Sequence, residues 1–238
     1  PWHAREIDRM IEEYDKLVPK GEWPNWVLGN HDKPRIASRV GRPQSRVAAM
    51  LLLTLRGTPT MYYGDELGME DVPIPSDRVQ DPWEKNEPGL GLGRDPQRTP
   101  MQWDDSPHAS FSAGLPWLPL SADHAQRNVD CLARDPQSIL SLYRKLIALR
   151  RQRKALIEGR YQRVESHADL LSYERALDGE RLLVVLNFSH EAAQLPLDAR
   201  AGHVLLSTCL DREGEAVEGE LSLRGDEGVV IELRKEIA

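Results

Sequence analysis

The chain has 238 residues and a mass of 27.0 kDa, which suits one large domain or two smaller ones with a sizeable core. Its formal net charge is −7 and no Lys/Arg block stands out, so the basic surface of a nucleic-acid binder is absent and a neutral, hydroxyl-rich ligand fits better. The two cysteines, Cys131 and Cys209, belong to no disulfide framework or zinc motif.

Apolar runs and the N-terminal sequence bear on location. The longest apolar run, Ala48–Leu55, is too short to span a bilayer, so we expect no membrane partner. Pro1-Trp2-His3 shows neither an initiator Met nor a signal-peptide pattern, so we expect the natural chain to continue upstream. Because the cysteine usage fits a reducing compartment, the expected location is cytoplasmic.

Predicted helices and strands alternate at the start of the chain. Ala4–Leu17 has apolar residues at spacings of three and four, which is typical of an amphipathic helix. Trp26–Asp32 is a short apolar run with a polar end, which predicts a buried strand that delivers functional side chains at its C-terminal tip. Ser45–Arg56 is predicted to be an apolar helix, and Thr60–Tyr63 a second buried strand. The order indicates an α/β fold.

The rest of the chain contains an irregular segment, a predicted helix and a series of short predicted strands. Residues 68–135 are rich in Pro, Gly, Asp and Asn and form a segment far longer than an ordinary connection, so we expect it to be functional or separately folded. Ser138–Leu149 is predicted to be a helix. Short runs separated by turn residues then predict a small antiparallel β domain. These runs are Leu170–Tyr173, Leu182–Phe188, His203–Leu206 and Gly228–Leu233. The predicted domains are residues 1–160 and 161–238.

The residues Asn30-His31-Asp32 are the first candidate site. An imidazole and a carboxylate together can bind vicinal hydroxyls of a sugar, and the carboxylate can stabilise positive charge in a transition state. Alternatively, the aspartate caps the following turn and the histidine belongs to the core. The pair alone leaves both interpretations open.

Three ordered blocks resemble the α-amylase family of glycoside hydrolases. Asn25–Asp32 is similar to the family's last catalytic block, on the seventh barrel strand, and Leu53–Met69 is similar to the helix and eighth strand that follow. Asp81–Asn86 and Gly91–Asp104 resemble the α-glucosidase and oligo-1,6-glucosidase branch. The resemblance implies an α/β fold: the C-terminal portion of a TIM (β/α)8 barrel, with the seventh and eighth strands and flanking helices, followed by a small all-β antiparallel C-terminal domain.

The resemblance also implies roles for four residues. Asp32 would be the catalytic carboxylate that stabilises an oxocarbenium-like transition state, and His31 would bind the sugar hydroxyls. Arg94 would bind substrate at the bottom of the pocket or pair with a carboxylate there, because a fixed guanidinium fork suits that task. Arg98, in the same loop, would contribute to substrate binding or brace the loop. No metal site or cofactor is expected.

Two carboxylates follow the second predicted strand and are left off the site. Asp65 and Glu66 could line the pocket or tie a neighbouring loop, and the residues themselves favour neither. Trp83 and Trp103 could stack on a sugar ring, although packing of the long loop is the commoner use of such side chains.

The remaining carboxylates of a retaining glycosidase have no counterpart in this sequence. Retention needs a nucleophile and an acid/base about 5–5.5 Å apart, and the family's blocks for both lie upstream of the His31-Asp32 block. An intact barrel takes about 250 residues, whereas the predicted barrel part ends at residue 160. We therefore expect the chain alone to be inactive and of low stability, and its expected partners are an oligosaccharide or disaccharide and the N-terminal half of the barrel.

Three functions remain open. The first is part of a retaining α-glucosidase that hydrolyses short α-linked gluco-oligosaccharides from the non-reducing end. The second is a glucosyl-transferring relative that acts on trehalose or sucrose. The third is a non-catalytic interaction module on the same fold, as in transporter heavy chains, against which the presence of His31, Asp32 and Arg94 argues.

Overall fold

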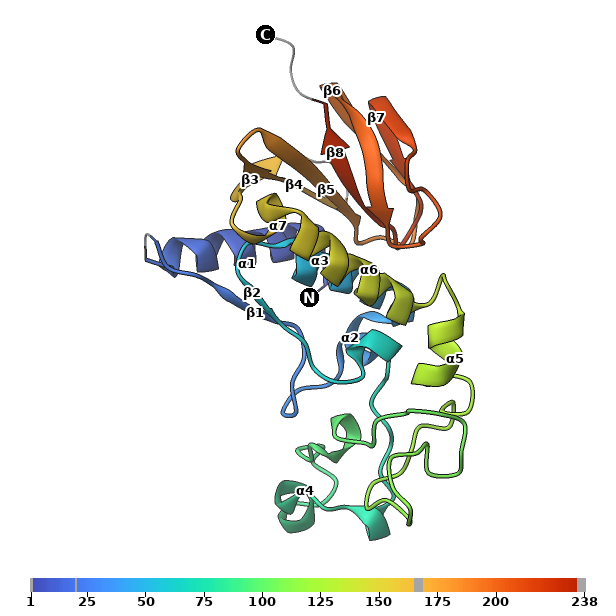
Figure 1. Cartoon of the computed structure of the whole chain (residues 1–238). Helices are drawn as coiled ribbons and strands as arrows, with labels where there is room; N and C mark the ends of the chain where they lie inside the picture. The colour runs from blue at the N-terminus through green and yellow to red at the C-terminus, as the bar shows by residue number, and fades with distance from the viewer. Residues whose placement is uncertain (1, 20, 165–168, 235–238) are drawn as a thin grey trace. The chain divides into compact units, whose positions relative to one another are not determined.

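A computed structural model describes residues 2–19, 21–164 and 169–234 (Figure 1). Pro1, where the upstream continuation is expected, lies outside them. Two compact units are present, and each is assembled from separate segments of the chain. Unit 1 comprises Pro1–Trp26, Arg46–Thr60 and Leu142–Ala238, and unit 2 comprises Val27–Ser45 and Met61–Ser141. These two units group residues that contact one another in space. The predicted domains, residues 1–160 and 161–238, are continuous segments of the chain, and that division stays a prediction.

In the described residues, all the helices precede the strands of a six-stranded sheet in the chain. The α-helices are α1 (Ala4–Leu17), α2 (Ile36–Val40), α3 (Arg42–Thr54), α4 (Pro82–Asn86), α5 (Val129–Arg134), α6 (Ile139–Gln152) and α7 (Lys154–Ile157). The strands are β1 (Asn25–Val27), β2 (Thr58–Thr60), β3 (Arg160–Val164), β4 (Leu170–Leu177), β5 (Glu180–Asn187), β6 (Ala193–Ser207), β7 (Ala216–Leu223) and β8 (Gly228–Leu233). Short 3-10 turns lie at Asp65–Leu67, Ser76–Arg78 and Asp95–Gln97.

The three long helices confirm the sequence predictions. Helix α1 has the predicted bounds and buries Ala4 and Ile11 on one face. Helices α3 and α6 start or end within a few residues of the predicted positions. In α1 and α6 one side of the helix is buried, which gives the apolar spacing, whereas α3 is buried on all sides from Val47 to Leu53.

The two early strands differ from the prediction. Strand β1 covers only Asn25–Val27 with both end residues exposed, and β2 lies at Thr58–Thr60, before the predicted run. They pair with each other in a two-stranded sheet. A strand becomes fully buried when neighbouring strands and covering helices surround it, and β1 and β2 have only each other as strand neighbours in the described residues. The prediction of two buried strands at Trp26–Asp32 and Thr60–Tyr63 is therefore wrong in extent and burial.

The predicted antiparallel β domain is confirmed as a six-stranded sheet in unit 1. Its strand order is β3-β4-β5-β8-β6-β7, and every neighbouring pair is antiparallel. Strands β3 and β7, which the sequence analysis missed, form the two edges (Figure 1). Their inner neighbours carry the continuous apolar runs. Strand β3 is largely polar, and in β7 the exposed Glu218-Gly219-Glu220 interrupts the alternation of buried Val217, Leu221 and Leu223, which explains why the pattern did not reveal them.

Both faces of the sheet's centre are buried. Leu183 and Val185 of β5 belong to an apolar cluster with residues of β6, β7 and β8. On the opposite face, Tyr173 of β4 lies directly across from Val184 in the register, and its hydroxyl is 2.5 Å from the Oγ1 of Thr54 in α3. One face of the sheet thus carries an apolar cluster, and the other face is joined to helix α3 of unit 1.

A buried arginine links three segments of unit 1. Arg150 of α6 is 8% exposed. Its Nη1 donates to the carbonyls of Leu53, Leu55 and Leu156 at 2.9, 3.0 and 2.8 Å, and its Nη2 donates to the carbonyl of Gly57 at 2.5 Å. Carbonyls at a helix end are unpaired within the helix, so one guanidinium satisfies the end of α3 and the turn that follows it.

Replacing this arginine should destabilise unit 1. We expect Arg150→Met to lower the free energy of unfolding by about 2 kcal/mol, because carbonyls that accept charged hydrogen bonds are left buried without donors. Urea unfolding followed by circular dichroism measures the change. The matched control is Arg151→Met, which alters an exposed neighbour, and equal stabilities of the two variants would contradict the structural role.

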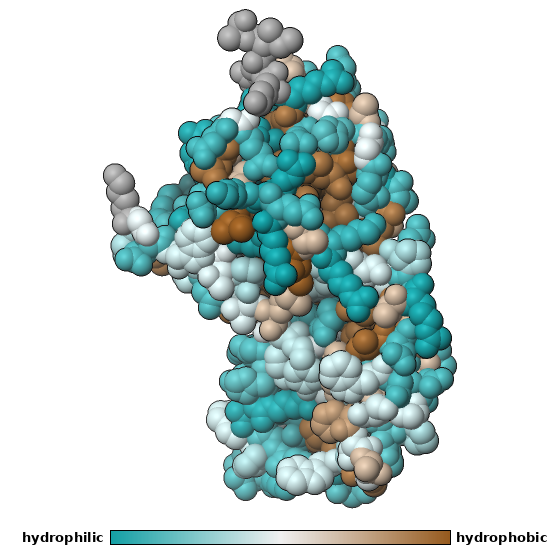
Figure 2. All heavy atoms as spheres, viewed as in Figure 1, coloured by the Kyte–Doolittle hydropathy of each residue, from teal (hydrophilic) through white to brown (hydrophobic). Residues whose placement is uncertain are grey.

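Unit 2 is built around a small core and long irregular segments. Leu67, Met69, Met101 and Leu140 form the buried apolar cluster. Hydrophilic residues cover most of the face visible in Figure 2, and apolar residues appear there in separate patches. In the described part of the chain, no helix has both the length and the apolar character needed to cross a membrane.

Candidate active site at the end of strand β1

A tight turn presents His31 and Asp32 shortly after β1. The side chain of Asn30 accepts a hydrogen bond from the backbone N–H of Asp32 at 2.8 Å, and Asn30 and Lys33 form an isolated bridge. The turn leaves the side chains of His31 and Asp32 64% and 44% exposed. They therefore remain accessible to a ligand, and neither is a core residue.

The His31 ring lies beside the Asp32 carboxylate. The distance from Nε2 of His31 to Oδ2 of Asp32 is 3.3 Å. An imidazole and a carboxylate in this arrangement offer a donor and acceptors to adjacent hydroxyl groups. The structure thus brings the first two predicted site residues together.

Two arginines from the long loop reach the other oxygen of Asp32. Nη1 of Arg94 and Nη2 of Arg98 each donate to Oδ1 of Asp32 at 3.1 Å. Nε of Arg98 also donates to the backbone carbonyl of His31 at 2.9 Å. All four predicted site residues therefore form one cluster, in which Arg98 is already engaged with the turn.

The arginines keep Asp32 ionised. Loss of solvent around the carboxylate acts to raise its pKa, but hydrogen bonds from Arg94 and Arg98 and the charge of His31 outweigh that effect. The pKa of Asp32 is consequently lower than its ordinary value. A carboxylate that is negative over the physiological pH range can stabilise a developing cation.

A further carboxylate, which the sequence analysis did not assign, lies behind Arg94. Asp81 has no exposed side-chain surface, and its Oδ2 accepts from Nε of Arg94 at 2.7 Å. The hydrogen bonds from Arg94 hold the pKa of Asp81 well below its usual range. The sequence signal was present: an Asp before Pro82 is typical of a helix N-cap, and Asp81 does cap α4 by accepting from the N–H of Trp83.

Two other acidic residues close the loop that carries Asp81 and Arg94. Oδ2 of Asp95 accepts from the backbone N–H groups of Gln80 and Asp81 at 2.6 and 2.8 Å. Glu84 accepts from the N–H groups of Gly89 and Gly93 at 2.8 and 3.2 Å. The segment is irregular, but its backbone donors are satisfied by side chains, so it is a defined platform for the site.

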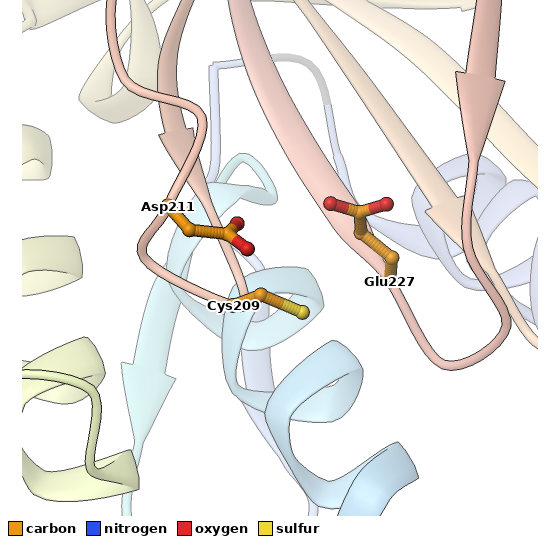
Figure 3. Close-up of side chains that lie close together, drawn as sticks. All are labelled: Cys209, Asp211 and Glu227. Carbon is orange, nitrogen blue, oxygen red and sulfur yellow. The ribbon is translucent and has the colours of Figure 1, made fainter.

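One group of side chains has the spacing of a metal site. In the described part of the chain, the ligand atoms of Cys209, Asp211 and Glu227 lie within 4.8 Å of one another (Figure 3). Arg224, however, donates to both oxygens of Asp211 at 2.7 Å and to Glu227 at 2.7 Å. Burial also raises the pKa of the Cys209 thiol. These carboxylates already have a cation partner, so the group does not fit a metal ion.

Asp65 is a buried carboxylate, in contrast to the exposed His31 and Asp32. It is 2% exposed. Its Oδ2 accepts a long hydrogen bond, 3.4 Å, from the N–H of Tyr62, and its Oδ1 has no hydrogen-bond partner in the structure. Burial is the main cause that raises the pKa of Asp65 to about 6, although the charge of Arg35 opposes it. Burial argues against Asp65 lining a pocket, and its hydrogen bond to Tyr62 lies within the same turn, so it does not tie a neighbouring loop either.

Asp65 should make the stability of unit 2 depend on pH. Because its folded pKa is about 6 and its ordinary value is 3.8, the folded state holds the proton more tightly. Stability is then full below about pH 4 and falls as the pH rises through 6. At 1.36 kcal/mol per pKa unit the cost at neutral pH is about 3 kcal/mol. Asp65→Asn should reduce this slope in urea unfolding measured between pH 4 and 7, while the pKa of Glu66, which burial also raises, leaves a smaller slope; the exposed Asp77→Asn should retain the full slope. Parallel profiles for wild type and Asp65→Asn would refute the assignment.

Comparison with known proteins identifies the family. The model of the family described as alpha amylase, catalytic domain, matches residues 1–159. The chain belongs to the α-amylase family. A second family model, a domain of unknown function (DUF3459), matches residues 158–230.

Relatives of this α-amylase family chain include enzymes and a transporter subunit. It is 34% identical to an oligo-1,6-glucosidase of Parageobacillus thermoglucosidasius over 87% of its own length and 41% of that protein. It is also 34% identical to a probable α-glucosidase of Rhizobium meliloti (strain 1021), covering 88% and 40% of the two chains. The amino acid transporter heavy chain SLC3A1 of Mus musculus is 34% identical over 95% of this chain and 33% of that one.

Solved structures agree with the family assignment. The trehalulose synthase MutB from Pseudomonas mesoacidophila MX-45 matches with a TM-score of 0.87 and 30% identity, over 98% of this chain and 47% of that one. The predicted fold, the C-terminal portion of the α-amylase barrel followed by an antiparallel all-β domain, is thereby confirmed. The α-amylase family chain spans less than half the length of the relatives it matches.

Proposed function

We propose that this chain is the C-terminal part of a retaining α-glucosidase that removes glucose from the non-reducing end of short α-linked gluco-oligosaccharides. The observation that carries the proposal is the Asp32 cluster. An accessible carboxylate is kept ionised by Arg94 and Arg98, with His31 3.3 Å from its other oxygen. The 34% identity to an oligo-1,6-glucosidase supports the same activity.

Each member of the cluster has a task in the proposed reaction. Asp32 stabilises the positive charge that develops at the anomeric carbon, since a fixed anion acts most strongly on charge that appears in the transition state. His31 hydrogen-bonds the sugar hydroxyls beside it. Arg94 binds the substrate at the bottom of the pocket and contacts Asp32. Arg98 holds the His31-Asp32 turn through its hydrogen bond to the His31 carbonyl.

The attacking and protonating carboxylates come, in this proposal, from residues outside this sequence. The N-terminal part of the family's barrel supplies them and completes the pocket around Asp32. The substrate is an oligosaccharide or a disaccharide, and no nucleic acid is involved. The cytoplasmic location stays a prediction.

Glucosyl transfer is the second candidate function. The similarity to trehalulose synthase MutB, at 30% identity over 98% of this chain, favours it. Hydrolysis and transfer use the same glycosyl-enzyme intermediate and differ in whether water or a sugar hydroxyl attacks it.

An assay of the full product of the gene distinguishes the candidates. We expect the protein to hydrolyse isomaltose and maltose and to release α-glucose first, as proton NMR of the fresh product shows for a retaining enzyme. Conversion of sucrose into an isomeric disaccharide without net hydrolysis would support transfer instead. If a folded protein shows neither activity, the proposal is overturned, and the non-catalytic interaction module is the function that remains.

A further inference from the structure

We infer that Asp81 is a positioning residue that fixes Arg94 and balances the charge around Asp32. The inference rests on the proposed function, because it concerns the site where the sugar would react. Asp81 does not touch that position itself, since its side chain has no exposed surface. Both of its effects on the reaction would pass through Arg94, because Asp81 orients that guanidinium and offsets its charge.

The contacts of Asp81 immobilise one edge of the Arg94 guanidinium. Nε of Arg94 donates to Oδ2 of Asp81 at 2.7 Å and Nη2 donates to Oδ1 at 3.3 Å. The backbone N–H of Arg94 donates to the same Oδ2 at 2.8 Å. A guanidinium is planar and rigid, so fixing two of its nitrogens fixes the third. The remaining nitrogen, Nη1, is the one that contacts Asp32 at 3.1 Å.

Asp81 is itself held from two directions. Its backbone N–H donates to Asp95 at 2.8 Å, and its Oδ1 accepts from the N–H of Trp83 at 3.0 Å. The position of the Asp81 carboxylate is therefore fixed by Asp95 and by the start of α4, independently of Arg94. Such a supporting layer is what keeps a site residue within a fraction of an ångström of its working position.

Charge balance gives Asp81 its second effect. The charges of the two guanidinium groups, Arg94 and Arg98, are matched by those of the two carboxylates, Asp32 and Asp81; Nη1 of Arg98 also lies 4.0 Å from Asp81. Without Asp81, two guanidinium groups would face the single carboxylate of Asp32. The excess positive charge would oppose the cation that forms on the sugar in the transition state.

The kinetic test uses the full gene product. We expect Asp81→Asn to lower kcat at least about 10-fold while KM changes less than about 3-fold, because the lost charge matters mainly in the transition state. Glu84→Gln is the matched control: Glu84 closes the same loop through the N–H groups of Gly89 and Gly93. Equal losses in the two variants would show that Asp81 only shapes the loop, and would overturn the inference.

A double-mutant cycle checks that Asp81 acts through Arg94. In an Arg94→Met background, Asp81→Asn should cause no further loss of kcat, since the group it positions is gone. Losses that multiply in the double variant would mean that the two residues act independently, and would refute the inference.

A spectroscopic test on the 238-residue chain needs no activity. The Nε–H of Arg94 should give a nitrogen-15 NMR resonance protected from exchange, which Asp81→Ala removes, because alanine offers no acceptor, and Glu84→Gln retains. Retention of the resonance in Asp81→Ala would overturn the inference whatever the enzyme does. If the resonance behaves as expected but the full gene product cleaves and transfers no α-glucoside, the proposed function fails while the attachment of Arg94 to Asp81 stands.

Discussion

The purified 238-residue chain should release no p-nitrophenol from p-nitrophenyl α-glucoside. The Asp32 cluster can stabilise a cationic transition state. It supplies neither the carboxylate that attacks the anomeric carbon nor the carboxyl group that protonates the leaving oxygen. Loss of residues that act as such a unit costs many orders of magnitude in rate. The measurement is a long incubation with concentrated protein, compared with buffer alone.

The same assay with the upstream half of the barrel added completes this test. We expect turnover only in the mixture, because each half would then contribute groups that the other lacks. The mixture with Asp32→Asn in the chain serves as the control for contaminating glucosidase. Turnover by the chain alone that survives further purification would show that other carboxylates do the chemistry.

Asp32→Asn in the full gene product should lower kcat at least about 10²-fold, the usual cost of removing one electrostatic partner of a transition state. The amide keeps the shape of the carboxylate and can still accept hydrogen bonds, so substrate binding should suffer much less. Steady-state kinetics on maltose and isomaltose separate the two effects.

Asp105→Asn is the control, because it removes one negative charge from an exposed residue that does not belong to the candidate site. It should leave kcat within about twofold, far less than a tenfold step of 1.4 kcal/mol. A kcat of Asp32→Asn equal to that of Asp105→Asn would remove Asp32 from the mechanism and with it the proposed function.

Local patterns in the sequence were sufficient for elements whose cause is local. Helix α1 was predicted with its bounds because its apolar spacing and the breaks on either side lie within a few residues. The site residues His31, Asp32, Arg94 and Arg98 were proposed from blocks that resemble a family, and the structure places them in one cluster. Their roles stay predictions.

Features that depend on distant residues were missed or misplaced. The extents of β1 and β2 are set by their pairing across about thirty residues of chain, which no local pattern reports. Asp81 was quoted in a sequence block but given no role, because its partner Arg94 lies 13 residues away in an irregular loop. Edge strands β3 and β7 lack a continuous apolar run, since each of them has exposed residues along its length.

The edge strand β7 also determines how the β domain meets other molecules of its kind. An unpaired strand edge offers free backbone groups to a second sheet, which is a common route to fibrils and precipitates. In β7, Glu218 and Glu220 flank Gly219, which has a φ of +76°, and all three residues are exposed. Negative charge and a local bend in the same place prevent another strand from lying flat along this edge. Of the sheet's two edges, the one formed by β7 is thereby disfavoured for self-association at neutral pH.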